Sequence, residues 1–293
     1  MAEITQPTGT WIFDGDVLRI VPGHGRGVHA LRTALGEVTV PLEAMAGVSY
    51  EAGRKGGRLR LRLRGGVDPL TQATGGGLRD AADPYLLEVE KDRAGVAEYL
   101  ADAVRDALVI EQVPDTPADR YLLPGPTVPL TLHASDGEMV FDGEEVRIAW
   151  GWAAEESKKS GGPRALALAD LAAVTWSPPR LESGCLRLVP KAPHAPVKPA
   201  HDPNCVVLWG WRAARETAES ALLAAAVTAR LPHPLAAREA PALPAPAEPA
   251  ALAAAPDHDT ILRRLRELGE LHRGGVLTDE EFSAAKKAMI DRL

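Results

Sequence analysis

A short phrase that occurs twice constrains the fold of this chain most. WIFDGDVLRI (11–20) and MVFDGEEVRI (139–148) share Phe-Asp-Gly, followed by an Arg-Ile pair at the same spacing. Four further blocks recur in the same order: VPLEAMAGVSY (40–50) with LALADLAAVTW (166–176), GRLRL (57–61) with GCLRL (184–188), DPYLLEV (83–89) with DPNCVVL (202–208), and alanine-rich Arg93–Ile110 with Arg212–Leu231. A period this long indicates two copies of one domain rather than a solenoid of short repeats.

The blocks within each copy predict antiparallel strands followed by one helix. Asp14-Gly15, between residues that favour strands, is typical of a two-residue hairpin turn. In Arg58–Arg64, strict alternation places leucines on one face of a strand and arginines on the other. A helical stripe then follows at Val96, Tyr99, Leu100, Val104 and Leu108. We therefore predict a mainly β fold with α, in which each copy is a partly open barrel closed by its C-terminal helix.

The number of strands and the single closing helix resemble the pleckstrin-homology-like (PH-like) fold. More narrowly, both copies resemble a bacterial family known as a domain of unknown function, DUF 4429. The matching features are FDG before an apolar-x-Ile strand, an apolar strand that ends in Val-x-aromatic, and Asp-Pro before the last strand. The resemblance covers 8–110 and 135–231, and it implies a fold but no activity.

The C-terminal part has a different character. Residues 232–256 contain seven prolines and predict an extended tether. Beyond them, a leucine stripe ends at Gly274-Gly275, and Thr278 with Glu281 forms a capping box that begins a second helix. This segment closely resembles the short C-terminal domain called SHOCT, which implies oligomerisation. The predicted oligomerisation residues are Leu262, Leu265, Leu268, Leu271, Val276, Leu277, Phe282 and Met289.

These patterns divide the chain into five parts. We expect a PH-like domain at 1–115, a linker at 116–134, a second PH-like domain at 135–231, a Pro/Ala-rich linker at 232–256 and a helical hairpin at 257–293. A hairpin this short buries too little apolar surface to be stable alone. Its stripe needs a partner, which is a second copy of the tail, the domains of its own chain, or another protein.

Basic residues give the first set of candidate binding sites. The loops at 22–32 and 150–164 contain glycine and cations, and in the PH domains that they resemble the corresponding loop holds phosphoinositide headgroups. A second set lies on and before the arginine strand. The candidate anion- or partner-binding residues are Arg26, Arg32, Arg54, Lys55, Arg58, Arg60, Arg62, Arg64, Lys158, Lys159 and Arg164. The alternatives are an ordinary flexible loop and an arginine face that is solvated or paired with carboxylates.

Tryptophans are candidate interface residues of a different kind. Five of the six lie in the second copy. Alternation along a strand predicts that Trp150 and Trp152 share a face, and that Trp209 and Trp211 do the same. An exposed face of this kind is a candidate protein interface, whereas packing in the core or at its rim is the alternative.

Catalysis is not expected. The sequence has no HExxH, no Walker loop and no nucleophile elbow, and Asp14 and Asp142 are better explained as turn residues. No metal or cofactor is predicted. The two cysteines, Cys185 and Cys205, fall in neighbouring predicted strands, where a bridge is possible, but reduced thiols are expected. A net charge of −7 argues against nucleic acid as a partner.

The sequence thus favours a self-assembling scaffold or adaptor without enzymatic activity. Its expected state is a homo-oligomer that binds a protein partner, in the cytoplasm because no signal peptide or membrane span is evident. The alternative is a peripheral protein that binds an anionic membrane surface or another anionic ligand through the basic loops and the arginine face.

Overall fold

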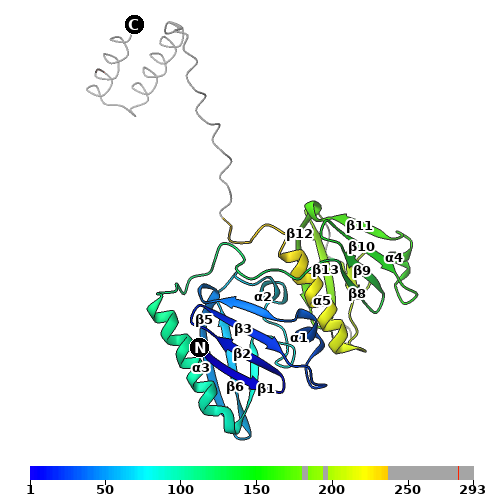
Figure 1. The fold of residues 1–293 in the computed structure, drawn as a ribbon. Helices are drawn as coiled ribbons and strands as arrows, with labels where there is room; N and C mark the ends of the chain where they lie inside the picture. The colour runs from blue at the N-terminus through cyan, green and yellow to red at the C-terminus, as the bar shows by residue number, and fades with distance from the viewer. Residues whose placement is uncertain (180–183, 194–196, 237–282, 284–293) are drawn as a thin grey trace. The chain divides into compact units, whose positions relative to one another are not determined.

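The computed structural model describes residues 1–179, 184–193, 197–236 and 283 (Figure 1). The chain divides into two units, Met1–Ala237 and Arg238–Leu293. Both copies of the repeat lie in the first unit, to which the following description applies. The predicted tether and the SHOCT-like hairpin lie almost entirely outside the described residues.

Each copy contains a four-stranded and a three-stranded antiparallel sheet. In the first copy these are β1-β2-β3-β4 and β5-β6-β7, and in the second β8-β9-β10-β11 and β12-β13-β14. The strands of copy one are β1 Ala2–Gln6, β2 Gly9–Phe13, β3 Val17–Pro22, β4 Val38–Pro41, β5 Met45–Gly53, β6 Gly56–Leu63 and β7 Leu86–Glu90. Those of copy two are β8 Leu130–His133, β9 Gly137–Phe141, β10 Glu145–Trp150, β11 Arg164–Ala167, β12 Leu171–Ser177, β13 Cys185–Pro190 and β14 Cys205–Val207.

The helices differ more between the copies than the strands do. Copy one has α1 Ala30–Leu35, α2 Pro69–Thr74 and α3 Ala94–Ile110, with short 3₁₀ turns η1 Leu42–Ala44 and η2 Lys91–Arg93. Copy two has α4 Glu156–Lys159, η3 Leu168–Asp170 and α5 Ala213–Thr228. The mainly β architecture with a C-terminal helix in each copy was therefore predicted correctly.

The prediction of barrels is wrong, because none of the four sheets closes on itself. A 3₁₀ corner separates the two sheets of each copy. At this corner in copy one, the Leu42 amide donates to the carbonyl of Asp16 at 2.7 Å. Leu168 does the same with Glu144 at 2.7 Å in copy two. The chain therefore leaves one ladder before it begins the next, and each copy is a sandwich of two sheets around its own core.

The repeated FDG phrase forms the β2–β3 and β9–β10 turns, as predicted. The Asp14 carboxylate accepts the amides of Asp16 and Val17 at 3.1 and 2.9 Å, and Asp142 makes the equivalent pair at 2.9 Å each. Gly15 has a φ of 119°, a left-handed value that glycine tolerates best. These backbone hydrogen bonds lower the pKa of both aspartates, which identifies them as turn residues.

The helical stripe predicted for α3 is correct except at Tyr99, which is 63% exposed. Ala97 and Ala101 are buried beside Leu100 and Val104 instead. Small side chains at these two positions let the helix approach the sheets closely, so the large ring at 99 lies on the opposite side.

Helix α5 packs on two cores at once. One side of it, with Leu223 and Val227, covers the sheets of copy two. The other side, with Ala221 and Leu222, joins a separate apolar cluster with Leu31 of α1 and Leu70 of α2. Figure 1 shows α5 beside these two short helices of copy one. The two copies therefore pack together as one compact unit and are not two independently packed domains.

Truncation of Leu31 to alanine tests this second cluster. Because Leu31 is fully buried at the contact, we expect the free energy of unfolding to fall by about 2–5 kcal/mol in urea denaturation. Ile110→Ala is the matched control, and because Ile110 is exposed it should change stability by less than about 0.5 kcal/mol. Equal effects of the two substitutions would contradict the packing described for α5.

Candidate functional site

The arginine face of β6 is formed as predicted, but the protein itself supplies its counter-charges. Arg58 lies 2.9 Å from Asp80. Arg60 lies 3.2 Å from both Asp80 and Asp83. The carboxylates come from the segment between α2 and β7, which folds back over the strand. This part of the face therefore corresponds to the carboxylate-paired alternative and not to a free anion site.

The other arginines of this face bind backbone carbonyls. Arg64 donates to the carbonyls of Glu43 at 2.7 Å and Thr116 at 2.8 and 2.9 Å, which attaches the segment after α3 to the sheet. Arg62 makes a weak 3.5 Å contact with the Ala46 carbonyl. A backbone carbonyl does not neutralise the charge of a guanidinium group, but it occupies the N–H groups that would otherwise bind an anion.

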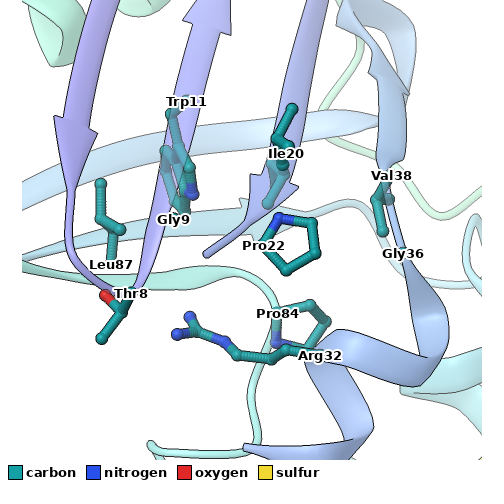
Figure 2. Close-up of a pocket in the computed structure, with 11 residues that line it drawn as sticks. Thr8, Gly9, Trp11, Ile20, Pro22, Arg32, Gly36, Val38, Pro84 and Leu87 are labelled. Atoms are coloured by element: carbon teal, nitrogen blue, oxygen red, sulfur yellow. The ribbon is translucent and has the colours of Figure 1, made fainter. Parts of the chain in front are cut away.

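Arg32 is not an anion-binding loop residue, because it is buried in α1 and holds the start of β7. Its guanidinium donates to the carbonyls of Asp83 at 3.0 Å and of Leu86. Burial lowers the pKa of Arg32. Figure 2 shows its side chain directed toward Thr8, at one end of a cavity beneath Trp11. This cavity measures about 10 Å³, which accommodates about one water molecule and no larger ligand.

Some predicted cations remain accessible. Arg26 in the β3–α1 loop is exposed, and so are Arg54 and Lys55 at the tip of the β5–β6 hairpin. Within the described part of the chain, none of the three side chains has a hydrogen-bond or ion-pair partner. Arg164, at the start of β11, is half-buried. The hairpin tip therefore carries two adjacent exposed cations without a partner among the described residues.

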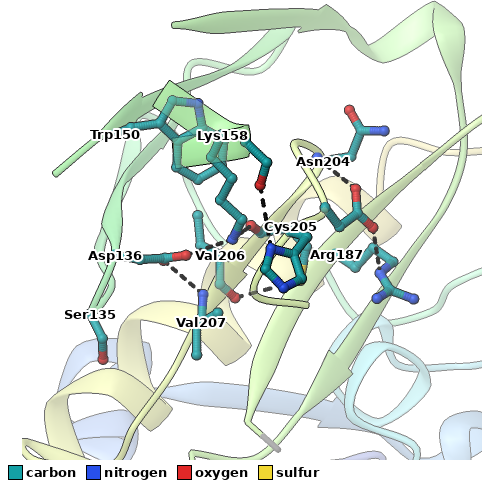
Figure 3. Close-up of polar contacts among 12 residues, drawn as sticks. Ser135, Asp136, Trp150, Lys158, Arg187, Asn204, Cys205, Val206 and Val207 are labelled. Atoms are coloured by element: carbon teal, nitrogen blue, oxygen red, sulfur yellow. Dashed lines mark hydrogen bonds and ion pairs between the residues drawn. The ribbon is translucent and has the colours of Figure 1, made fainter. Parts of the chain in front are cut away.

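Lys158 is fully buried, which contradicts its prediction as an anion-binding residue. Its ammonium lies 2.6 Å from the Asp136 carboxylate and 2.8 Å from the carbonyl of Cys205. Asp136 also accepts the amide of Val207 at 2.8 Å (Figure 3). Trp150 covers the pair, with its ring centroid 4.9 Å from the ammonium. The pair joins α4, the β8–β9 turn and β14, so its role is structural.

The neighbouring Lys159 is exposed and has a different role. Its ammonium donates to the carbonyl of Trp152 at 2.9 Å. It thus fixes the backbone of the segment between β10 and α4, and Trp152 itself extends into solvent with 88% of its surface exposed.

The tryptophans do not share strand faces as predicted, because β10 ends at Trp150 and β14 ends before Trp209. Trp150 is half-buried and donates to the Gly162 carbonyl at 3.2 Å. Trp211 is 74% exposed, and its ring meets that of Trp209 edge-on with centroids 5.2 Å apart. The strands end here because the chain must turn to α4 and to α5, and alternation does not extend past a turn.

The β8–β9 turn brings the two exposed tryptophans to one end of copy two. Gly151, which precedes Trp152, donates its amide to the Asp136 carbonyl at 2.9 Å. Trp209 donates its amide to the Ser135 hydroxyl at 3.0 Å. We call Trp152, Trp209 and Trp211, whose backbone lies beside this turn, the tryptophan surface. Sequence reasoning identified these residues but not the turn that unites them.

Glu216 of α5 orders the segment that contains Trp211. Its buried carboxylate accepts the amides of Gly210 at 2.8 Å and Arg212 at 3.4 Å. A carboxylate that binds amides at the beginning of a helix is a stabilising arrangement. Trp211 is therefore presented from an ordered backbone.

A cleft between the two copies was not predicted from the sequence. It has a volume of about 310 Å³ and lies between α1, the α2 end at Asp68, the linker at Leu123–Thr127 and Leu222 of α5. Asp68 is held there by the Tyr85 hydroxyl at 2.9 Å and by the amides that it caps. The cleft exists only because α5 joins copy one, so no sequence pattern indicates it.

Comparison with known families agrees with this geometry. The model of the family described as "Domain of unknown function (DUF4429)" matches residues 11–105 and 139–228. The chain belongs to the DUF4429 family. The two matched segments are the two copies of the repeat. No protein with a curated description matches the chain.

Two further observations concern this DUF4429 chain. Among the described residues, no three metal-ligating side chains lie close enough together to hold an ion. No described helix is long and apolar enough to cross a membrane.

Substitution of Lys158 by methionine tests its buried ion pair. Because Asp136 would be left buried without a cation, we expect the free energy of unfolding to fall by about 3–5 kcal/mol, measured by urea denaturation. Lys159→Met, one residue away and exposed, is the matched control and should cost less than about 1 kcal/mol. A stable Lys158→Met protein would show that Asp136 does not depend on this partner.

Proposed function

We propose that this protein is a non-enzymatic, self-assembling scaffold of the cytoplasm that uses the tryptophan surface of copy two as its main contact site. The observation that carries this proposal is the exposure of Trp152 and Trp211 at one end of an otherwise ordered domain. Tryptophan is the residue most enriched at binding hot spots, because it buries a large area at little cost in conformational entropy.

Two finer assignments form part of this proposal. The four-plus-three strand sandwich with a C-terminal helix supports a PH-like fold for each copy, a fold often used for binding rather than catalysis. The sequence pattern at 257–293 supports a SHOCT-like hairpin that joins chains. Weak contacts of the tryptophan surface then become strong when the tails bring several chains together.

Sedimentation velocity of the full chain tests self-association and the part that the tryptophans take in it. We expect concentration-dependent oligomers, and at least about tenfold weaker association after Trp152→Ser and Trp211→Ser together, which is roughly 1.4 kcal/mol. Tyr99→Ser is the matched control, since it removes an exposed ring from α3, and it should leave the association unchanged.

Introducing charge into the leucine stripe of the tail distinguishes a contact made by the tails from one made by the tryptophan surface. Leu265→Glu with Leu268→Glu should also weaken the oligomer if the tails join chains. A full chain that is monomeric at every concentration would reject self-assembly. An oligomer unaffected by the tryptophan substitutions would reject the tryptophan surface as its contact site.

A second candidate function is binding to an anionic membrane surface through the β5–β6 hairpin. It is favoured by Arg54 and Lys55, which are exposed and without partners among the described residues. Co-sedimentation with phosphatidylserine vesicles tests it. Arg54→Ser with Lys55→Ser should weaken binding about thirtyfold, at roughly 1 kcal/mol per cation.

The matched control for the membrane hypothesis is Arg58→Ser with Arg60→Ser. It removes the same charge from positions that Asp80 and Asp83 already compensate, so its effect should be smaller. Wild-type protein that stays in the supernatant with these vesicles would exclude this candidate function.

A further inference from the structure

The two cysteines lie together on one face of a sheet. Cys185 begins β13 and pairs with Val207, while Cys205 begins β14 and pairs with Arg187. Because side chains two residues apart share a face, the two thiols occupy diagonal positions on neighbouring strands. Both are free and buried in this structure.

The diagonal offset determines what kind of bridge these thiols could form. Diagonal residues in a sheet are further apart than the 4.4–6.8 Å between Cα atoms that suits a relaxed disulfide. Bridging them therefore needs a local shift of β13 against β14. A disulfide strained in this way is more easily reduced than a structural one. The diagonal geometry therefore favours a disulfide that forms and is reduced reversibly over a permanent structural disulfide.

The surroundings assign different roles to the two sulfurs. The neighbouring Cys205 thiol lowers the pKa of Cys185 to about 7, while the Cys205 thiol itself donates to the carbonyl of Val206 at 3.7 Å. Arg187, Ser177 and Lys158 act in the same direction, while burial opposes them. The neighbouring Cys185 thiol, together with burial, raises the pKa of Cys205. Cys185 is also the more accessible residue, at 8% exposed against 0% for Cys205.

We propose that Cys185 and Cys205 form a reversible oxidation site that reacts with small-molecule disulfides. The Cys185 thiolate attacks one sulfur of the disulfide, forms a mixed disulfide and releases one small thiolate, which takes up a proton. Cys205 then loses its proton and attacks the Cys185 sulfur, which releases the second small thiol. The protein loses two electrons and two protons, and the small disulfide gains them.

The bridge would tie β13 to β14 just before the segment that contains Trp209 and Trp211. The proposal does not depend on the proposed scaffold function, because it concerns only the covalent state of the two thiols.

The experiment uses the full chain in buffers with set ratios of glutathione to glutathione disulfide. After acid quenching, free thiols are alkylated under denaturing conditions and counted by mass spectrometry. We expect conversion to a monomeric chain that is lighter by two hydrogens, with a Cys185–Cys205 cross-link in the peptide map, and full reversal with excess glutathione. Thiols that stay alkylatable in the most oxidising buffer, or cross-links only between chains, would overturn the proposal.

Single serine variants test the assigned roles. Cys205→Ser should trap glutathione on Cys185, and its reaction should be at least about tenfold faster than that of Cys205 in Cys185→Ser, because Cys205 is fully buried, which disfavours its thiolate, while Cys185 is the more accessible thiol. Equal rates would overturn the assignment of Cys185 as the attacking residue. The peptide map of the wild-type chain still decides whether the bridge forms if either variant fails to fold.

Discussion

The packing of α5 on two cores is the interaction on which the rest of the structure depends. This helix covers the sheets of copy two with one side and joins α1 and α2 of copy one with the other. Its run of alanines makes this possible, because small side chains let a helix be approached closely from both sides. Without this contact, the two copies would be independent sandwiches, and the cleft between them would not exist.

The distribution of charge shows why the two copies offer different surfaces. In copy one, Asp80 and Asp83 compensate Arg58 and Arg60, so much of the most basic strand is satisfied within the chain. In copy two, the buried pair of Lys158 and Asp136 organises the end of the domain where the tryptophans lie. Buried polar groups thus hold the backbone at the end of copy two where the tryptophan surface lies.

The sequence predicted the strands and turns of each copy better than it predicted how the sheets are arranged. The duplication, the FDG turns and the leucine face of β6 follow from local rules and were found. The barrels were wrong because the 3₁₀ corners at Leu42 and Leu168 redirect the chain between sheets. Lys158 was misassigned because its burial depends on Asp136, which is far from it in sequence. The short helices α1 and α2 lie where the sequence shows only glycine-rich loops.

The sequence by itself determined that this chain has two copies of one domain, because hydrophobic periodicity and turn residues are local properties and recur visibly. It also determined the residues from which a binding surface could be made. Only the tertiary structure decided which of them are accessible. Arg32 and Lys158 are buried while Trp152 and Trp211 are exposed, since burial depends on which distant segments pack over a residue. The juxtaposition of Cys185 with Cys205 likewise depends on strand register, which is fixed by long-range pairing.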